Sequence, residues 1–418
     1  MLGVKPATLY AYVSRGLLPR EKDAHGSTFD PRDIARLARS GRSRRDGGGS
    51  LGRRPAPGGA GRPAESGDRV SESSEPLFVT ELTLIEDGHL YFRGLDAVEL
   101  SRVRSFEEVA GWLWSGTWPD RGEPWRTPLA ANVAVNDALE AVPEGSRPLE
   151  RYVLAVVVAA LSDELRHDLS PAVVPVIGRG IISLLAETLT VIEGGGGLAD
   201  PSSMGPIAAR VWRALSSLEP SPRRVSLLDA ALVLSADHEL APSTMAARVA
   251  ASCRADVYAV VSTGLGPPSG SWAAGSTGAP TEVERMLEDS LVVGPERAVG
   301  ERLRQTGTVP HGFGMPLYPE GDPRGRELLS RLEEVDGPPE RQAVVARILE
   351  LASERGFPPP NVDLGLGALS FCAGMPRESG QAIATLAKVA GWLAHALEEY
   401  ASPSRFRSRA YYVGPRPG

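Results

Sequence analysis

Apolar and polar residues recur with a clear period from Leu77 onward, and that period changes at Gly94. Residues 77–94, LFVTELTLIEDGHLYFRG, alternate apolar and polar positions on both sides of an acidic turn that ends at Gly88. Alternation around such a turn predicts a β-hairpin. After Gly94 the apolar residues recur every three or four positions, which is the period of a helix with one buried face.

The helical pattern continues almost to the end of the chain. It predicts helices over 95–117, 126–142, 146–163, 169–191, 204–216, 225–237, 242–263, 281–290, 295–305, 324–334, 338–355, 363–373 and 378–400. Strands do not recur between these segments, so a parallel sheet is not expected. The sequence therefore predicts an all-α fold with a short β-hairpin near its start.

The first 76 residues differ from this body. Residues 1–38 predict a small separate module with a short amphipathic helix that closes at Gly16 and a second helix after Asp30. Residues 39–76 are dominated by Arg, Gly, Pro and Ser and have no apolar face. Such a segment buries too little surface to order itself, so we expect a disordered linker that is basic in its first part.

Composition narrows the functional classes. The chain has 418 residues, of which 42% are hydrophobic and 23% charged, as in soluble globular proteins. No apolar run approaches the roughly 20 residues of a membrane helix, and no signal peptide opens the chain, so we expect a cytoplasmic protein. The net charge of −7 argues against a nucleic-acid coat. Cys253 and Cys372 lie far apart, which predicts two ordinary buried thiols.

Three polar clusters interrupt the helical body. The first is Asp-His-Glu at 237–239, where one predicted helix ends and the next begins. The second is HGFGMPLYPEGDPR at 311–324, in which Arg324 offers a planar fork that suits a carboxylate. The third is Asp363, at the start of a helix inside an apolar stretch. This carboxylate either caps its helix or acts as a general base with a raised pKa.

Long motifs in a fixed order carry a family resemblance. ADHELAPSTMAARVAASCRADVYAVVSTGLG, GFGMPLYPEGDPR, NVDLGLGAL, AGWLAH and RSRAYYVG together resemble citrate synthase over residues 77–418. The resemblance implies a large helical domain over 77–269 and 363–418, a smaller helical domain over 270–362, and a homodimer. Residues 1–38 resemble a MerR-type helix-turn-helix that lacks its first helix.

For single residues, the resemblance makes Asp363 the general base that removes a proton from the methyl group of an acyl-CoA. It assigns His238 and Arg324 to holding the dicarboxylate substrate, oxaloacetate. Lys388 stands where the family has another carboxylate-binding arginine, so it keeps the charge but lacks the bidentate fork. Arg407 corresponds to an arginine that the partner subunit contributes.

The resemblance also implies a CoA-binding loop. Gly312, Phe313 and Gly314 correspond to residues of that loop. An acyl-CoA is then a substrate or ligand, and neither a tightly bound cofactor nor a metal is expected.

Two histidines of the family pattern are absent. GSWAAGST over 270–277 places Ala273 at the position that stabilises the enolate, and GFGM places Met315 at the position that polarises the ketone. Neither side chain donates a hydrogen bond. Losing one such donor costs roughly 10²–10³ in rate, so we expect impaired or altered turnover. His311 is either an exposed loop histidine or a substitute that swings into the site.

Three functions remain open on the sequence. The first is an acyltransferase that condenses acetyl-CoA or another acyl-CoA with oxaloacetate or a related 2-oxo acid. The second is a catalytically silent homologue that binds these ligands or regulates a true citrate synthase. The third is a metabolite-binding regulator that contacts DNA through the N-terminal module. Against this third hypothesis stand the negative charge and the missing first helix of the motif.

Overall fold

The computed structural model of the chain describes residues 21–23, 26–28, 78–119, 124–143, 145–189, 205–269, 279–402, 406 and 413–414. The chain divides into two compact units, Met1–Ser73 and Ser74–Gly418. In the first unit, β1 (Glu21–Asp23) pairs antiparallel with β2 (Gly26–Thr28). The two helices expected within residues 1–38 and the linker expected over 39–76 lie outside the described residues.

The second unit begins with a small antiparallel sheet. Its strands are β3 (Thr83–Glu86), β4 (His89–Phe92) and β5 (Leu95–Asp96), in that order. The predicted hairpin is confirmed, and its turn has positive φ at Asp87 (50°) and Gly88 (77°), which Asp-Gly adopts readily. β5 occupies the first two positions of a predicted helix, because the Asp96 side chain caps the helix that follows.

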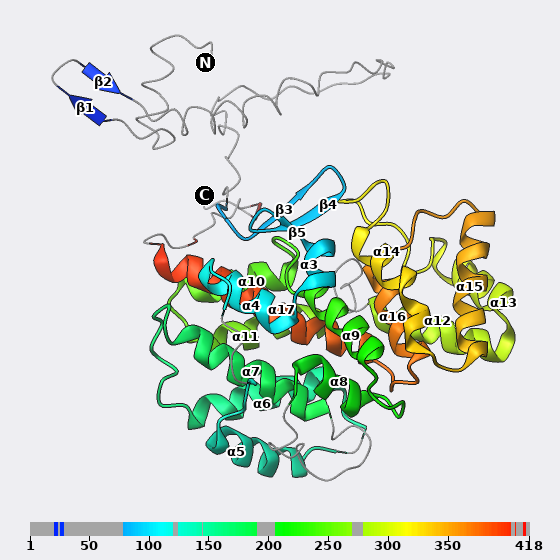
Figure 1. The fold of residues 1–418 in the computed structure, drawn as a ribbon, viewed down its shortest axis with the longest axis horizontal. Helices are drawn as coiled ribbons and strands as arrows, with labels where there is room; N and C mark the ends of the chain where they lie inside the picture. The colour runs from blue at the N-terminus through cyan, green and yellow to red at the C-terminus, as the bar shows by residue number, and fades with distance from the viewer. Residues whose placement is uncertain are drawn as a thin grey trace. The chain divides into compact units, whose positions relative to one another are not determined.

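The rest of the second unit is helical, which confirms the predicted fold class (Figure 1). The helices are α3 (Ala97–Val103), α4 (Phe106–Ser115), α5 (Leu129–Glu140), α6 (Pro148–Ser162), α7 (Val174–Thr188), α8 (Ile207–Leu215), α9 (Pro222–Ser235), α10 (Pro242–Ser252), α11 (Val257–Leu265), α12 (Ala279–Val293), α13 (Pro295–Thr306), α14 (Pro323–Ser330), α15 (Pro339–Glu354), α16 (Val362–Cys372) and α17 (Ser379–Ala401). Two short 3-10 turns, η2 (Pro267–Ser269) and η3 (Leu332–Val335), follow α11 and α14.

Two of the predicted helices are each broken in two by a helix-capping side chain. Ser105 starts α4 with a capping box, in which its hydroxyl accepts from Glu108 N and its own N–H donates to the Glu108 carboxylate. Asp256 starts α11 by accepting a hydrogen bond from Ala259 N at 3.0 Å. Both caps satisfy N–H groups that a helix start leaves unpaired, so the chain turns there although the apolar period continues.

α17 forms the centre of the body. It packs against α4, α7, α9, α10, α11 and α16, and Figure 1 shows it running through the middle of the helical mass. Its Trp392 is fully buried, and Gly264 of α11 approaches the indole so closely that a Cβ there would lie 2.7 Å from it. Small residues on α11 therefore let α17 sit deep in the core.

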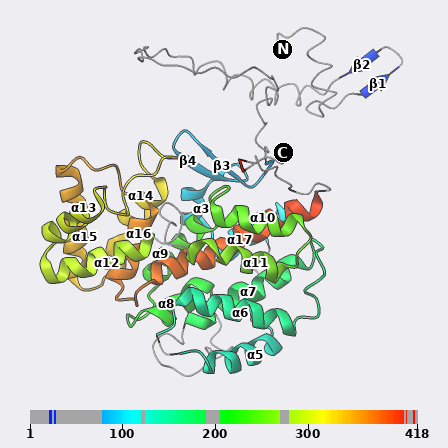
Figure 2. The same ribbon diagram turned by 180° about the vertical axis from the view of Figure 1, so that it is seen from behind.

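α12 to α16 gather on one side of this body, as Figures 1 and 2 both show. Within this group α14 meets α16 at Gly325, where a Cβ would lie 2.3 Å from the backbone of Asn361. Only glycine allows that approach, and it brings the start of α14 next to the start of α16. The division into a large and a small domain stays a prediction.

The two cysteines differ in their surroundings. Cys372 is buried in α16, as predicted, but Cys253 is exposed, so the prediction of a buried thiol there is wrong. Cys253 is the C-cap of α10, at a corner where Arg254 has φ of 61° and the chain turns outward. None of the helices among the described residues is long and apolar enough to cross a membrane.

Candidate functional site

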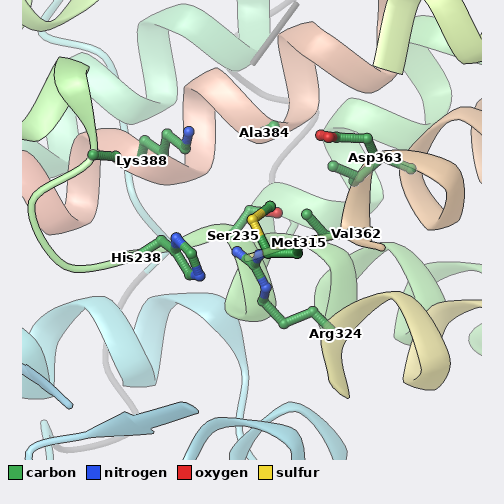
Figure 3. A pocket seen from close by; sticks show the side chains of 10 residues that line it. Ser235, His238, Met315, Arg324, Val362, Asp363, Ala384 and Lys388 are labelled. Atoms are coloured by element: carbon green, nitrogen blue, oxygen red, sulfur yellow. The ribbon is translucent and has the colours of Figure 1, made fainter. Parts of the chain in front are cut away.

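A small cavity of about 30 Å³ collects residues from segments far apart in the sequence. It is lined by Ser235, His238, Ala241, Met315, Arg324, Val362, Asp363, Leu366, Ala384 and Lys388 (Figure 3). Five of the residues singled out in the sequence are among them: His238, Met315, Arg324, Asp363 and Lys388. The α9–α10 corner, the loop before α14, and α14, α16 and α17 supply the walls.

Asp363 is not the cap of its helix. The Asn361 side chain caps α16 instead, accepting from Asp363 N at 3.0 Å and Leu364 N at 3.3 Å. Within the described ranges, no side chain or backbone group hydrogen-bonds the Asp363 carboxylate, which is 5% exposed. Burial raises the pKa of Asp363 to about 6, although the positive charges of Arg324 and Lys388 oppose the rise. Such a carboxyl group is suited to accept a proton near neutral pH.

Arg324 is buried and already holds one carboxylate. Its Nε and Nη2 donate to the two oxygens of Asp322 at 2.9 and 2.8 Å. Asp322 also caps α14 and accepts from Val362 N at 3.1 Å, so it joins the starts of α14 and α16. The fork that we expected to be open therefore has one edge occupied. Among the described residues, no group accepts from Nη1, so the other edge is available to a ligand.

His238 is held by an aromatic residue that the sequence analysis missed. Its Nε2 lies 2.9 Å from the hydroxyl of Tyr318, and the Tyr318 ring centroid lies 5.6 Å from the Arg324 guanidinium carbon. Burial and the nearby charges of Arg324 and Lys388 hold the pKa of His238 well below its usual range, so the ring is neutral. A neutral imidazole that uses Nε2 toward Tyr318 presents one further nitrogen to the cavity side.

The other members of the first polar cluster lie outside the cavity. Asp237 is buried and accepts from the Thr83 hydroxyl and from His395 Nε2, the latter at 3.2 Å. The other ring nitrogen of His395 lies 3.0 Å from Nη1 of Arg248. This network fixes the corner that carries His238. The sequence analysis did not single out His395. The only sign of its role in the sequence is that it is a lone imidazole in an apolar helix.

Lys388 extends from α17 toward the cavity beside His238 (Figure 3). Its ammonium group forms no ion pair and no hydrogen bond with any residue that the structure describes. Burial lowers the pKa of Lys388 to about 8, while the carboxylate of Asp363 works in the opposite direction.

The loop before α14 needs glycine at two positions. Gly312 and Gly314 have φ of 98° and 77°. The backbone of this loop pairs with the segment before α16, with Asn361 N donating to Gly312 O at 2.9 Å and Gly314 N donating to Pro359 O at 2.8 Å. These contacts hold the Met315 side chain at the cavity, where it offers no hydrogen-bond donor.

A second cavity, of about 380 Å³, lies beside the same loop. It is lined by Glu282, Arg285, Met286, Asp289, Glu301, Arg302, Gln305, Thr306, Thr308, Val309, Pro310 and His311. His311 is exposed and borders this cavity rather than the smaller one. Ala273 and Arg407, the two remaining candidates, lie outside the described residues.

All the similar proteins named below are citrate synthases. The sequence pattern of the family described as citrate synthase, C-terminal domain, matches residues 73–409. Citrate synthase 2 of Bacillus subtilis (strain 168) is 28% identical over 358 residues, which cover 80% of this chain and 93% of that protein. Citrate synthase of Haloferax volcanii is 29% identical over 347 residues, covering 79% and 90%.

Solved structures share the fold. The ternary complex of carboxymethyl coenzyme A and oxaloacetate with citrate synthase from Thermoplasma acidophilum superposes with a TM-score of 0.68 at 21% identity, covering 82% of this chain and 95% of that one. Citrate synthase from Pyrobaculum aerophilum gives a TM-score of 0.68 at 24% identity, covering 82% and 91%.

Proposed function

The chain belongs to the citrate synthase family, and from this premise we propose that it is an acyltransferase that condenses an acyl-CoA with oxaloacetate or a related 2-oxo acid. One observation carries the proposal. The Asp363 carboxylate is buried and without a hydrogen-bond partner among the described residues, and it faces a cavity that it shares with Arg324 and Lys388. A base and two cations in one cavity suit proton removal from a thioester beside an anionic second substrate.

The cations support an anionic 2-oxo acid as the second substrate. The unoccupied edge of Arg324 binds one carboxylate, and Lys388 offers a second positive charge. The neutral ring of His238, oriented by Tyr318, contributes a hydrogen bond. The Thermoplasma acidophilum complex contains carboxymethyl coenzyme A and oxaloacetate, and this pair of ligands agrees with the substrates that we propose.

Substrate binding requires the cavity to open. Its free space of about 30 Å³ holds only about two or three water molecules, too little for a 2-oxo dicarboxylate. Arg324, Met315 and Asp363 line one side, and His238 and Lys388 line the other. We infer that the proposed small domain, residues 270–362, moves against the remainder when a substrate enters.

The glycine loop is our candidate for contacting CoA. Gly312, Phe313 and Gly314 lie between the small cavity with Asp363 and the cavity of about 380 Å³ with His311. In this proposal the thioester end reaches Asp363, while the larger cavity provides room for another part of the CoA molecule.

Turnover is slow in this proposal. Met315 has no hydrogen to donate to the ketone, and Ala273 offers none to the enolate. Each missing donor costs roughly 10²–10³ in rate, although two losses within one site do not add simply.

The protein is proposed to act as a homodimer, in which Arg407 of one subunit reaches the site of the other. An apolar face on α6 supports a second copy as the partner. Val153, Val157 and Leu161 follow one another at four-residue spacing and are 40%, 48% and 79% exposed.

The test is release of the CoA thiol with oxaloacetate and a panel of acyl-CoAs. We expect slow release that Asp363→Ala lowers at least about 100-fold. Asp336→Asn is the matched control, since its side chain is 93% exposed and asparagine tolerates its φ of 47°. Equal rates in Asp363→Ala and the wild type would refute the assigned base.

A catalytically silent, ligand-binding homologue is the second candidate. Met315 stands at the ketone-polarising position and has no hydrogen-bond donor, which weakens turnover while leaving the charges of Arg324 and Lys388 in the cavity to bind a ligand. Calorimetry with citrate, oxaloacetate and CoA separates the two candidates. Binding without thiol release from any substrate pair would support the silent homologue.

A further inference from the structure

Lys388 is unusual in the composition of this chain. The sequence contains 45 lysines and arginines, and only Lys5, Lys22 and Lys388 among them are lysines. From residue 23 to the C-terminus every other cationic side chain apart from histidine is therefore an arginine. A lysine at a position where the resemblance leads us to expect arginine runs against this strong preference, which points to a chemical requirement for an amine.

The surroundings of Lys388 differ from those of a structural cation. Its side chain lines the small cavity together with Asp363, Arg324 and His238 (Figure 3). Among the described residues it has no ion-pair or hydrogen-bond partner. A buried ammonium group without a partner is costly, so folding alone does not explain it.

The condensation needs a proton at the ketone oxygen of the 2-oxo acid. When the enolate attacks the ketone of the 2-oxo acid, the carbonyl π electrons move to oxygen and leave an alkoxide. Met315 has no proton to give, and an arginine at position 388 would hold its proton too tightly. Resting on the proposed function, we propose that Lys388 is the proton donor to the ketone oxygen of the bound 2-oxo acid.

Atoms and electrons balance in this step. Asp363 takes the α proton of the acyl-CoA, and the C–H electron pair forms the new C–C bond to the ketone carbon. The ketone oxygen takes a proton from Nζ of Lys388, which becomes a neutral amine. The protonated Asp363 then returns one proton to that amine through water, and hydrolysis of the thioester consumes one water and releases the CoA thiol. No oxidant or reductant is involved.

Electrostatics agrees with the direction of this proton cycle. Burial raises the pKa of Asp363 to about 6 and lowers that of Lys388 to about 8, so the return of the proton from carboxyl to amine is downhill. The charged or titratable groups that act on Lys388 are Asp363 on α16, Arg324 on α14, and Asp237 and His238 at the α9–α10 corner. A donor whose pKa lies near the working pH transfers its proton efficiently.

The first test compares Lys388→Arg with Lys388→Met. Arginine keeps the charge that binds the substrate but cannot release its proton. We expect Lys388→Arg to lower kcat by about 100-fold, to leave KM for the 2-oxo acid within about threefold, and to abolish the fall of kcat above pH 8. Lys388→Met should raise KM as well. A Lys388→Arg protein as active as the wild type, or more active, would overturn the assignment.

A second test needs no turnover. Because the chain holds three lysines, labelling with ¹⁵Nζ-lysine gives three side-chain signals, and Lys388→Arg identifies one of them. We expect that signal to titrate near pH 8, and a midpoint near the ordinary value of about 10.4 would contradict the proposal. Absence of thiol release from the wild type would remove both proposals, whereas wild-type release with an unaffected Lys388→Arg variant removes only this one.

Discussion

Met315 and Asp363 face the same cavity but differ in what they can do chemically. The carboxylate of Asp363 is buried without a hydrogen-bond partner among the described residues and is available to accept a proton. Met315, at the end of the glycine loop, presents a side chain without a donor. At the scale of single residues the site therefore combines a suitable base with an incomplete set of donors.

Replacing Met315 with histidine tests the missing donor. The loop contacts that hold position 315 come from Gly312 and Gly314, so the new imidazole should face the same cavity. We expect Met315→His to raise kcat at least about 10-fold, part of the roughly 10²–10³ that one such donor supplies. The measurement is steady-state thiol release, with Met315→Leu as control. An equal gain in both variants would assign the effect to packing.

The raised pKa of Asp363 predicts a pH dependence of activity. As the base must be ionised, kcat/KM should rise with pH through about 6 and level off above it. A profile that is flat between pH 5 and 7 would argue against Asp363 as the base.

The same raised pKa predicts a pH dependence of stability. The folded pKa of Asp363 exceeds the unfolded value of about 3.9, so the folded state binds more protons between pH 4 and pH 6. As the pH rises through that interval, the contribution of Asp363 to stability therefore falls. Asp363→Asn removes this effect and should be more stable than the wild type at pH 7 by roughly 2–3 kcal/mol. Urea unfolding at pH 4 and pH 7 measures the difference, and a variant equally destabilised at both pH values would contradict it.

At the scale of elements, the contact between α14 and α16 assembles most of the site. Asp322 bridges both helix starts, since it caps α14 and accepts from Val362 N. Gly325 lets the two backbones meet. Arg324 and Asp363 come from these two helices, so the distance between the proposed carboxylate-binding group and the proposed base depends on this contact.

Gly325→Ala should separate the two helices. Its Cβ would lie 2.3 Å from backbone atoms of Asn361, which cannot move as a side chain would. We expect the free energy of unfolding to fall by about 1–3 kcal/mol, and the affinity for oxaloacetate to fall with it. Urea unfolding and calorimetry measure the two effects. Gly300→Ala is the control, because its Cβ would meet only an arginine tip at 3.5 Å and alanine favours helix by about 1 kcal/mol.

A second buried carboxylate links other elements. Glu284 of α12 accepts from Ser370 Oγ at 2.7 Å, Glu378 N at 2.6 Å and Gly380 N at 2.8 Å. Burial raises its pKa to about 7, even though these three donors favour the ionised form. It thereby ties α12 to α16 and to the N-terminus of α17, the helix that carries Lys388.

At the scale of the whole molecule, the proposed homodimer rests on the apolar face of α6. Val157 lies in the middle of that face, between Val153 and Leu161. We expect Val157→Glu to convert a dimer into monomers, because it would bury a charge without a partner. Light scattering after gel filtration measures the mass. Val292→Glu, at an 85% exposed valine on α12, should leave the dimer intact, and loss of the dimer in both variants would contradict the assignment.

The sequence by itself determined the family, the helical fold and the identity of five cavity residues. The family motifs are long and ordered, and helical periodicity is a local property that survives in a single sequence. The sequence pattern did not predict the helix breaks at Ser105 and Asp256. A capping hydrogen bond depends on the side-chain rotamer in the folded chain, which the pattern does not record.

Tertiary structure alone decided how those residues are used. It made Asn361 the cap and left Asp363 without a hydrogen-bond partner among the described residues, and it filled one edge of Arg324 with Asp322. It also joined His238 to Tyr318, 80 residues away. Such pairings, like the burial that moves pKa values, depend on which helices pack together, and no local pattern in the chain records that.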